Sequence, residues 1–332
     1  MKRTIFLYLL AALFVTGGCG QDPADPVDRT PYPLVVPEGF PMPESPEDNT
    51  LTEARVALGR QLFHEPLLSG DSSITCASCH KRSLAFADSL PISPGVKGRM
   101  GFRNSPTLAN VAYLDLVNKD GGVPTLDLQP IVPIEDHAEM DLSILLAAER
   151  LNARPDYSTP FQRAYGDKAT PFTITRALAA FMRTLISGDS RYDQAARGGT
   201  TLTAAESRGQ ALFFSERTNC SSCHGGFNFT DNSFRNNGLY PAYEDHGRYR
   251  VTTDSADIGK FRVPTLRNIA CTAPYMHDGS VPSLREVLRH YNKGGNHPPN
   301  QDPLIRPLGL NESEIADLEA FLHSLTDDAF VN

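Results

Sequence analysis

Apolar residues between positions 141 and 186 recur at the spacing expected for amphipathic helices. The pattern is interrupted at Arg154-Pro155-Asp156 and again at Gly166-Asp167, where proline and glycine are typical helix breakers. This part of the chain is therefore predicted to form two helices. The apolar positions are Leu142, Leu145, Leu146, Leu151, Ile174, Leu178, Phe181 and Leu185.

Two further helices are predicted from their start signals. Thr203 and Asn311 each stand three residues before a glutamate, which is the arrangement of a capping box. No segment shows the alternation of a β-strand with comparable clarity. The chain is therefore expected to be mainly α, with long irregular loops. The second start signal leads into Ile315, Leu318, Phe321, Leu322 and Leu325.

Residues 1–18 are predicted to be a signal peptide. Two cations precede an apolar run from Ile5 to Val15 that is too short to span a bilayer, and Thr16-Gly17-Gly18-Cys19 follows as a small-residue cleavage site. The segment resembles a lipoprotein signal, in which Cys19 becomes the lipidated first residue of the mature chain. The alternative is an ordinary cleavage site nearby, with Cys19 incidental.

Residues 19–47 contain eight prolines and scattered acidic residues. This composition cannot bury a core and favours extended polyproline conformations. We expect a tether that holds the globular body away from a lipid surface. The remaining chain is long enough for two domains of ordinary size.

The chain carries 31 Lys and Arg residues against 39 Asp and Glu residues, a formal net charge of −8 at pH 7. Loss of Lys2 and Arg3 with the signal peptide makes the mature chain more negative. This balance argues against nucleic acid as a partner. An acidic surface can steer a basic electron-donor protein, but it can equally serve solubility alone.

Two Cys-x-x-Cys-His motifs carry the candidate chemistry. This spacing lets two thiols bond to the vinyl groups of one haem while the adjacent histidine ligates its iron. A zinc ribbon would bring its two CxxC pairs to roughly 15–20 residues apart, whereas these lie in separate halves of the chain, and a pair of disulfides is the other alternative. The motifs favour two covalently bound haem c groups. Their residues are Cys76, Cys79 and His80, and Cys220, Cys223 and His224.

The two halves resemble each other around these motifs. Gly59-Arg60-Gln61-Leu62-Phe63 precedes the first motif as Gly209-Gln210-Ala211-Leu212-Phe213 precedes the second, and a Pro-Thr-Leu triplet follows each, at 106–108 and 264–266. The pairing suggests duplication of a small cytochrome unit, with chance similarity as the alternative. We expect an N-terminal haem domain at 48–168, on which residues 305–332 can pack back, and a C-terminal haem domain at 169–304.

Between about residues 50 and 328 the sequence resembles the bacterial di-haem cytochrome c peroxidase superfamily, in its MauG-like branch. The motifs occur in family order around both haem sites, and jointly they are highly specific. The resemblance implies that peroxide reacts at the N-terminal haem and that the C-terminal haem transfers electrons. The motifs are Leu58–Phe63, Arg103–Leu108, Glu139-Met140, Pro264–Asn268 and Pro274–Gly279.

The first haem is expected to be five-coordinate, and an open iron position lets peroxide bind. Superfamily peroxidases that need reductive activation block this iron with a second histidine, but no histidine occurs in residues 81–136, and the aligned position is Val96. The resemblance assigns Gln129, Pro133 and Glu139 to the peroxide side. Glu139 would act as general acid and base, Gln129 would orient the bound oxygens, and Pro133 would shape the pocket.

The second haem is expected to have a phenol ligand. The family places this distal ligand fourteen residues after the histidine of the Pro-Tyr-x-His-Asp-Gly motif, which gives Tyr291 when counted from His277. A phenolate lowers the reduction potential, whereas a thioether favours Fe(II). The alternatives are that Tyr291 only packs at a helix end and that His290 or Met276 is the ligand.

A structural calcium ion between the haems is a further family feature. The aligned ligands are the Asn104 side chain and the backbone carbonyls of Thr272 and Pro274, and such oxygen ligands with several waters suit Ca²⁺.

The chain also departs from the family. It contains no tryptophan, and Lys119 occupies the usual tryptophan position between the haems. The haems would then communicate directly or through another aromatic residue such as Tyr113, unless charge sharing between them is weaker. Cys271 replaces the usual apolar residue beside the calcium carbonyls and is interpreted as a small buried hydrophobe, with redox activity as the minor alternative.

The expected function follows from an open first iron and a phenol-ligated second iron. Hydrogen peroxide reacts at the N-terminal haem, and the C-terminal haem stores or relays the other oxidising equivalent to oxidise residues of a protein partner, as in MauG-like enzymes. One alternative is a cytochrome c peroxidase that scavenges peroxide with electrons from a small cytochrome or copper protein. The other is a non-enzymatic di-haem electron carrier. The protein is expected to face the bacterial periplasm, held at a membrane by the lipid on Cys19.

Overall fold

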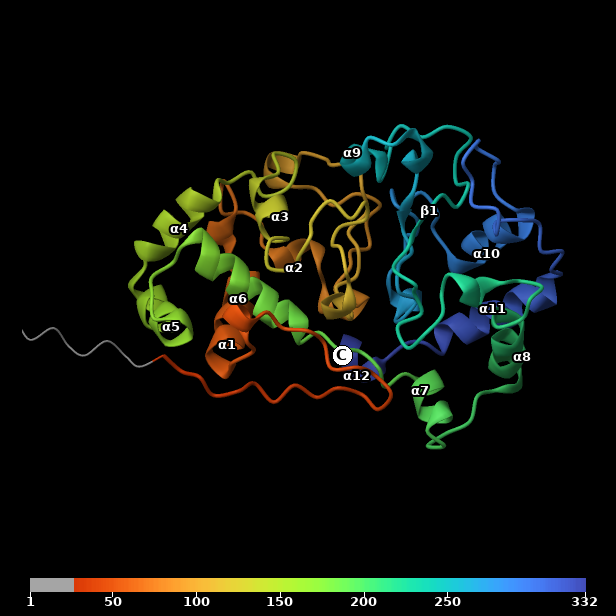
Figure 1. The fold of residues 1–332 in the computed structure, drawn as a ribbon, viewed down its shortest axis with the longest axis horizontal. Helices are drawn as coiled ribbons and strands as arrows, with labels where there is room; N and C mark the ends of the chain where they lie inside the picture. Colours follow the sequence, from red (N-terminus) through yellow and green to blue (C-terminus); the bar gives the residue numbers. More distant parts are fainter. Residues whose placement is uncertain (1–26) are drawn as a thin grey trace, which may run out of the picture.

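The computed structural model describes residues 27–332, so the signal peptide and Cys19 lie outside the described residues. Within this range the chain is mainly helical, as predicted, and two short strands, β1 (Phe234–Arg235) and β2 (Phe261–Arg262), form an antiparallel pair. The helices α1 to α6 form one lobe, and α8, α10 and α11 form the other (Figure 1). The helices are α1 (Glu53–Phe63), α2 (Cys76–Cys79), α3 (Ile131–Glu135), α4 (Ile144–Asn152), α5 (Pro155–Tyr165), α6 (Pro171–Arg183), α7 (Arg191–Ala196), α8 (Ala204–Phe213), α9 (Tyr249–Thr252), α10 (Leu284–Lys293), α11 (Glu312–His323) and α12 (Asp328–Val331).

The first lobe is built around the crossing of α1 and α6. Gly59 brings the two helices unusually close, because a Cβ atom there would lie 1.9 Å from the carbonyl oxygen of Ala177. The region between 141 and 186 forms three helices rather than the predicted two. Pro155 does not end a helix but starts α5 at its first position, where the missing N–H costs nothing.

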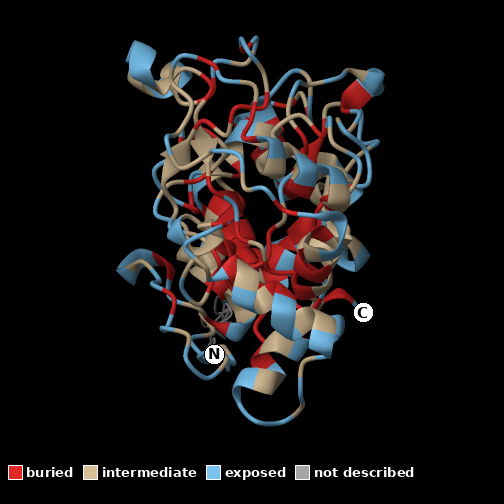
Figure 2. Cartoon of the chain, turned by 90° about the vertical axis from the view of Figure 1, so that its right-hand side faces the viewer, coloured by how far each residue is buried: buried red, intermediate tan, exposed pale blue. Residues whose placement is uncertain are grey.

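The second lobe repeats this arrangement with α8 and α11. A Cβ atom at Gly209 would lie 1.9 Å from the carbonyl oxygen of Asp317, so this glycine matches Gly59 in its role. Thr203 and Asn311 cap α8 and α11 through capping boxes, as predicted. The matched helix pairs confirm the duplication, and Figure 2 shows buried positions gathered on the helices.

The boundary between the lobes differs from the predicted one at residue 168. Helix α6 belongs to the first core, which extends from Leu58 to Leu185, so the division falls after Leu185. Helix α11 stays in the second core, and only the last residues return to the first lobe. There the ring of Phe330 lies 5.6 Å from that of Phe86. The predicted boundary at residue 168 would place α6 in the second lobe. The helices α6 and α11 are the matching last helices of the two repeats, so α6 completes the first lobe.

Residues 27–46 contain no helix and lie along the body of the protein (Figure 1). The backbone N–H of Tyr32 donates to Leu51 O at 3.2 Å, and the Phe40 ring packs edge-on against Phe227 of the second lobe at 4.7 Å. The expectation of a free tether is therefore wrong for residues 27–46, because apolar side chains between the prolines find partners on both lobes. In the part of the chain that is described, no helix combines the length and apolar character needed to cross a membrane.

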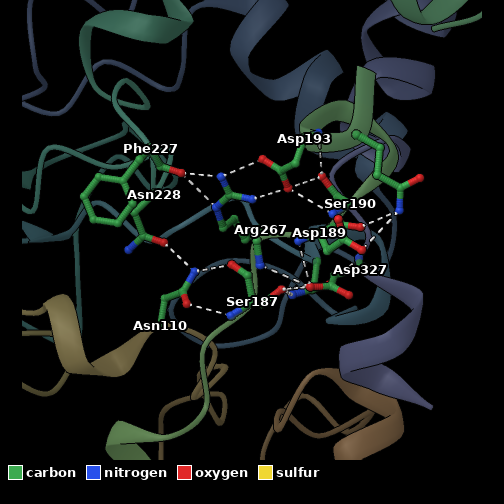
Figure 3. Close-up of polar contacts among 12 residues, drawn as sticks. Asn110, Ser187, Asp189, Ser190, Asp193, Phe227, Asn228, Arg267 and Asp327 are labelled. Carbon is green, nitrogen blue, oxygen red and sulfur yellow. Dashed lines mark hydrogen bonds and ion pairs between the residues drawn. The ribbon is translucent and has the colours of Figure 1, made fainter. Parts of the chain in front are cut away.

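A buried polar network joins the two lobes (Figure 3). Asn110 Nδ2 of the first lobe donates to Asn228 Oδ1 of the second at 3.0 Å and to Ser187 O at 2.8 Å. Asp327 accepts hydrogen bonds from the Ser187 hydroxyl and from the backbone N–H groups of Gly188 and Asp189, all at 3.0–3.1 Å. The network thus fixes the linker between α6 and α7 at the point where the lobes meet.

Candidate active site

A cavity of about 570 Å³ opens in the first lobe. Its walls come from α2, from the loop after α2, and from residues 129–140 around α3. The structure therefore brings together in one cavity all six residues predicted for the first haem and its peroxide side. They are Cys76, Cys79, His80, Gln129, Pro133 and Glu139.

The first motif has the geometry that a covalently bound haem needs. His80 Nδ1 lies 2.8 Å from the carbonyl oxygen of Phe86 and donates to it, which leaves Nε2 free to ligate iron. Ala85 and Phe86 have φ of +51° and +58°, and this left-handed turn directs the carbonyl at the imidazole. The Cys76 and Cys79 thiols form no disulfide. The residues present therefore fit a haem c group.

The second motif repeats this geometry. His224 Nδ1 donates to the carbonyl oxygen of Phe229 at 3.2 Å, and Phe229 has a φ of +52°. Cys220 and Cys223 are likewise free. The second motif therefore fits a haem c group for the same reasons as the first.

Tyr291 lies in the last turn of α10, beside the second motif. Burial raises the pKa of its phenol, and the neighbouring Cys223 and Cys220 raise it further. The hydrogen bond with the Asn237 side chain lowers the pKa in part. The two alternative ligands are already hydrogen-bonded. His290 Nε2 donates to the carbonyl oxygen of Asn237 at 3.0 Å, and Met276 Sδ accepts from Asn237 Nδ2 at 3.3 Å. Asn237 thus contacts all three candidate ligands, and ligation by Tyr291 stays a prediction.

Glu139 faces the first cavity. Glu139 is exposed at the cavity surface, and desolvation by the surrounding walls, with the charge of Asp136, raises the pKa of its carboxyl to about 7. Its backbone carbonyl accepts from the N–H of Val96 at 2.8 Å, and Val96 is buried. Position 96, which the sequence resemblance aligns with a blocking histidine, thus holds an apolar side chain whose backbone is bonded to that of Glu139.

Lys119 also lines the first cavity. Burial, with the nearby cations Arg262 and Arg103, lowers the pKa of its ammonium to about 8. Tyr113, the other candidate for communication between the haems, contacts Phe227 at 4.9 Å, where the two lobes meet.

Sequence reasoning missed three arginines that line the first cavity, Arg103, Arg250 and Arg262. Arg103 forms ion pairs with Asp120 and Asp245, each at 2.6 Å. Arg262 donates from Nε to Asn118 O at 3.3 Å, and burial lowers its pKa to about 10. Arg103 begins one recognised motif and Arg262 stands just before another, so a closer inspection of these motifs would have found them.

The contacts around the predicted calcium ligands do not test the calcium site. Asn104 is buried, and its Nδ2 donates to Leu90 O at 3.0 Å, while the Thr272 hydroxyl donates to Ile269 O at 3.1 Å. Pro274 follows a cis peptide bond. Calcium binding therefore stays a prediction.

Cys271 is a half-buried free thiol. Burial raises its pKa, so the reactive thiolate form is less populated, which agrees with a packing role.

Known proteins share both the fold and these motifs. A family model described as di-haem cytochrome c peroxidase matches residues 53–201, and one described as RoxA-like, cytochrome c-like, matches residues 261–293. The methylamine utilization protein MauG of Methylorubrum extorquens is 37% identical over 293 residues, which cover 87% of this chain and 82% of that protein. The chain belongs to the di-haem cytochrome c peroxidase family.

Two further relatives support this assignment. The cytochrome-c peroxidase IdrP1 of Denitromonas iodatirespirans is 36% identical over 315 residues, covering 85% of this chain and 84% of that protein. The crystal structure of a MauG-like protein associated with microbial copper homeostasis has a TM-score of 0.86 and 36% identity, covering 91% of this chain and 97% of that one. This di-haem peroxidase is therefore an oxidoreductase that acts with H₂O₂ and, in general terms, with a protein partner.

Proposed function

We propose that this di-haem peroxidase uses H₂O₂ at its N-terminal haem to oxidise a protein partner by long-range electron transfer, in the manner of MauG-like enzymes. One observation carries the proposal. The first cavity is lined by Gln129, Pro133 and Glu139 together with the ligating motif, and its described lining includes no histidine besides His80. An iron left open on this side can accept peroxide without prior reduction.

The residues around the cavity have separate tasks. Glu139 takes the proton from one peroxide oxygen and returns it to the other, since a carboxyl with a pKa of about 7 can both accept and donate near neutral pH. Gln129 orients the peroxide, and Pro133 limits the space around it. The haem, when bound, supplies the redox chemistry.

The choice of a protein partner depends on Tyr291. A phenol ligand lowers the reduction potential of the second haem and suits it to holding an oxidising equivalent. The position of Tyr291 close to Cys220 and Cys223 of the second haem motif supports this ligation. Because one solved relative is associated with copper homeostasis, a protein of that process is the first partner to test.

Three further features belong to the proposal. The protein faces the periplasm, it is anchored through a lipid on Cys19, and it binds Ca²⁺ through Asn104, Thr272 and Pro274. The sequence motifs alone support these features.

The second candidate function is scavenging of peroxide with electrons from a small cytochrome or copper protein. The similarity to cytochrome-c peroxidases and the net charge of −8 favour it. A non-enzymatic electron carrier is incompatible with membership of this enzyme family.

The deciding experiment adds H₂O₂ to the diferric holoprotein without prereduction. We expect an immediate change in the absorbance of both haems and slow turnover of reduced cytochrome c. Fast turnover of cytochrome c would support the scavenger instead. A second nitrogen or sulfur ligand on the first iron besides His80, detected by electron paramagnetic resonance in the resting protein, would contradict direct reaction of the diferric protein with H₂O₂ and leave the scavenger, activated by reduction, as the remaining function.

A further inference from the structure

A second cavity, of about 750 Å³, adjoins the first, and Phe102 and Arg250 line both. Its walls carry aromatic and acidic side chains from the segment 240–246 and from the motif around His277. None of these residues has a part in the peroxide chemistry described above. The further lining residues are Tyr240, Ala242, Glu244, Asp245, His246, His277 and Asp278.

Tyr240 and Asp278 form a paired phenol and carboxylate on the wall of this cavity. The Tyr240 hydroxyl donates to Asp278 Oδ2 at 2.6 Å. Burial pushes the pKa of Asp278 upward, but hydrogen bonds from Tyr240 and Ser280 outweigh it and hold the pKa below its ordinary value. Burial and the bond to Asp278 raise the pKa of Tyr240. At neutral pH a protonated phenol therefore faces an ionised acceptor.

This arrangement suits the one-electron oxidation of a phenol. A phenol that loses an electron becomes a strong acid, and a base within hydrogen-bond distance can take the proton in the same step. Asp245, the neighbouring carboxylate, is already engaged by Arg103. Asp278 is thus the carboxylate positioned to accept the hydroxyl proton of Tyr240.

An aromatic path connects Tyr240 with the second haem site. Its ring lies 5.8 Å from that of the buried Tyr243. The Tyr243 hydroxyl lies 3.5 Å from Asn237 Oδ1, and Asn237 flanks Tyr291. Tyr243 hydrogen-bonds amide groups rather than a carboxylate, so it lacks a strong proton acceptor of its own.

A second path leads from Tyr240 toward the first cavity. The Tyr240 ring lies 6.1 Å from the imidazole of His277, which stacks on Phe261 with ring centroids 4.1 Å apart. The next residue, Arg262, lines the first cavity. Tyr240 is therefore linked to the second haem site through Tyr243 and the amide of Asn237, and to the first cavity through His277, Phe261 and the neighbouring Arg262.

We propose that Tyr240 is the redox-active residue through which electrons of the reductant enter the protein, with Asp278 as its proton acceptor. Tyr240 gives one electron to the oxidised haem pair, and its hydroxyl proton passes to Asp278. The neutral tyrosyl radical then takes one electron from a donor and the proton back from Asp278. Two such cycles supply the two electrons that reduce one H₂O₂, with two solvent protons, to two molecules of water.

The lining indicates the class of donor. The carboxylates Glu244, Asp245 and Asp278 outnumber the cation Arg250 in the lining, which favours a cationic group, and the ring of Tyr240 favours an aromatic one, while Arg250 already lies over the Phe102 ring at 4.8 Å. The proposal rests on the proposed reaction with H₂O₂ and names the route by which its oxidising equivalents leave the protein. Tetramethyl-p-phenylenediamine is a suitable probe, since it is an aromatic amine and a one-electron reductant.

The test uses the holoprotein with three substitutions. Tyr240→Phe removes the hydroxyl, and Asp278→Asn removes the charge but keeps an acceptor oxygen. Tyr249→Phe is the matched control, because Tyr249 is half-buried beside the cavity residue His246, with ring centroids 5.5 Å apart. Each protein is mixed with H₂O₂ alone to follow the haem absorbance, frozen for electron paramagnetic resonance, and assayed with the diamine.

We expect Tyr240→Phe to keep the haem response to peroxide, to lose the tyrosyl signal, and to oxidise the diamine at least about tenfold more slowly. Asp278→Asn should slow the same step and abolish its solvent deuterium isotope effect. Tyr249→Phe should behave like the unsubstituted protein. In the unsubstituted protein, a radical trap followed by peptide mass spectrometry should label Tyr240.

Unchanged diamine oxidation in Tyr240→Phe, or trapping only at other tyrosines, would overturn the inference and leave the proposed function standing. If the haems of the unsubstituted protein do not respond to H₂O₂ at all, the proposed function itself is wrong.

Discussion

At the scale of single residues, Glu139 makes the reaction with peroxide depend on pH. The raised pKa of about 7 means that the carboxylate fraction grows as the pH rises through neutrality. Only the carboxylate can take the first proton from peroxide, so the rate of the haem response should rise between about pH 6 and 8 and then level off. Stopped-flow mixing with H₂O₂ across this range measures the effect.

Substitution of Glu139 tests directly whether its carboxyl causes this pH dependence. Glu139→Gln should react about 10² to 10⁴ times more slowly and without the inflection near neutrality. Glu149→Gln is the control, because Glu149 is exposed on α4. An inflection that persists in Glu139→Gln would show that another group titrates.

Tyr291 should set the potential of the second haem. Tyr291→Met replaces an anionic oxygen by a thioether, which favours Fe(II), so the midpoint potential of this haem should rise by roughly 0.1 V or more. Potentiometric titration resolves the two haems, and the first haem serves as the internal reference. An unchanged potential would mean that Tyr291 is not a ligand and only packs at the end of α10.

At the scale of elements, the two glycine crossings should be indispensable. Gly59→Ala and Gly209→Ala each place a Cβ atom 1.9 Å from a carbonyl oxygen of the facing helix, so the helices must move apart. Each substitution should lower the free energy of unfolding by about 1–3 kcal/mol or more. Urea unfolding of the holoprotein measures the loss.

The control for these crossings is Gly199→Ala. A Cβ atom there would lie at an ordinary 3.4 Å from Gln194 O, and we expect a change within about 0.5 kcal/mol. Because alanine favours a helix more than glycine does, losses at Gly59 and Gly209 no larger than at Gly199 would mean that the close approach of the helices does not limit stability.

The elements also show what the sequence could reveal. The caps at Thr203 and Asn311 are local signals, since donor and acceptor lie within one turn, and both helices were predicted. The closeness of Gly59 to Ala177 joins residues far apart in the chain, so α6 was assigned to the wrong lobe. Pro155 was predicted to interrupt a helix, but it is the first residue of α5. Proline can both break a helix and start one, so its presence alone did not reveal the extra helix.

The same distinction applies to the site. The haem motifs and Glu139 were found because each lies in a short pattern with fixed spacing. The bond between Tyr240 and Asp278 joins residues 38 positions apart, and no spacing rule connects them.

At the scale of the whole molecule, the two lobes are held by the linker between α6 and α7. Asp327, at the far end of the chain, accepts three hydrogen bonds from residues 187–189, and its side chain is buried (Figure 3). Asn268, in the second lobe, donates to the Ser187 hydroxyl at 2.9 Å and accepts from the Asp327 N–H at 2.8 Å. Asp327 therefore fixes the linker between the lobes, in addition to direct contacts such as those of Asn110 with Asn228 and of Arg103 with Asp245.

Asp327→Ala tests this role. Loss of the carboxylate leaves three buried donors without an acceptor, and because hydrogen bonds to charged groups contribute roughly 1.5–3 kcal/mol each, we expect a loss of about 3 kcal/mol or more in urea unfolding. The neighbouring exposed residue supplies the control, Asp328→Ala, with a change near zero. The response of the second haem to peroxide should also slow in Asp327→Ala, because residues 187–189 of the linker between the lobes are no longer fixed. If Asp327→Ala loses stability but the second haem responds at the normal rate, the linker supports folding alone and electron transfer between the haems does not depend on it.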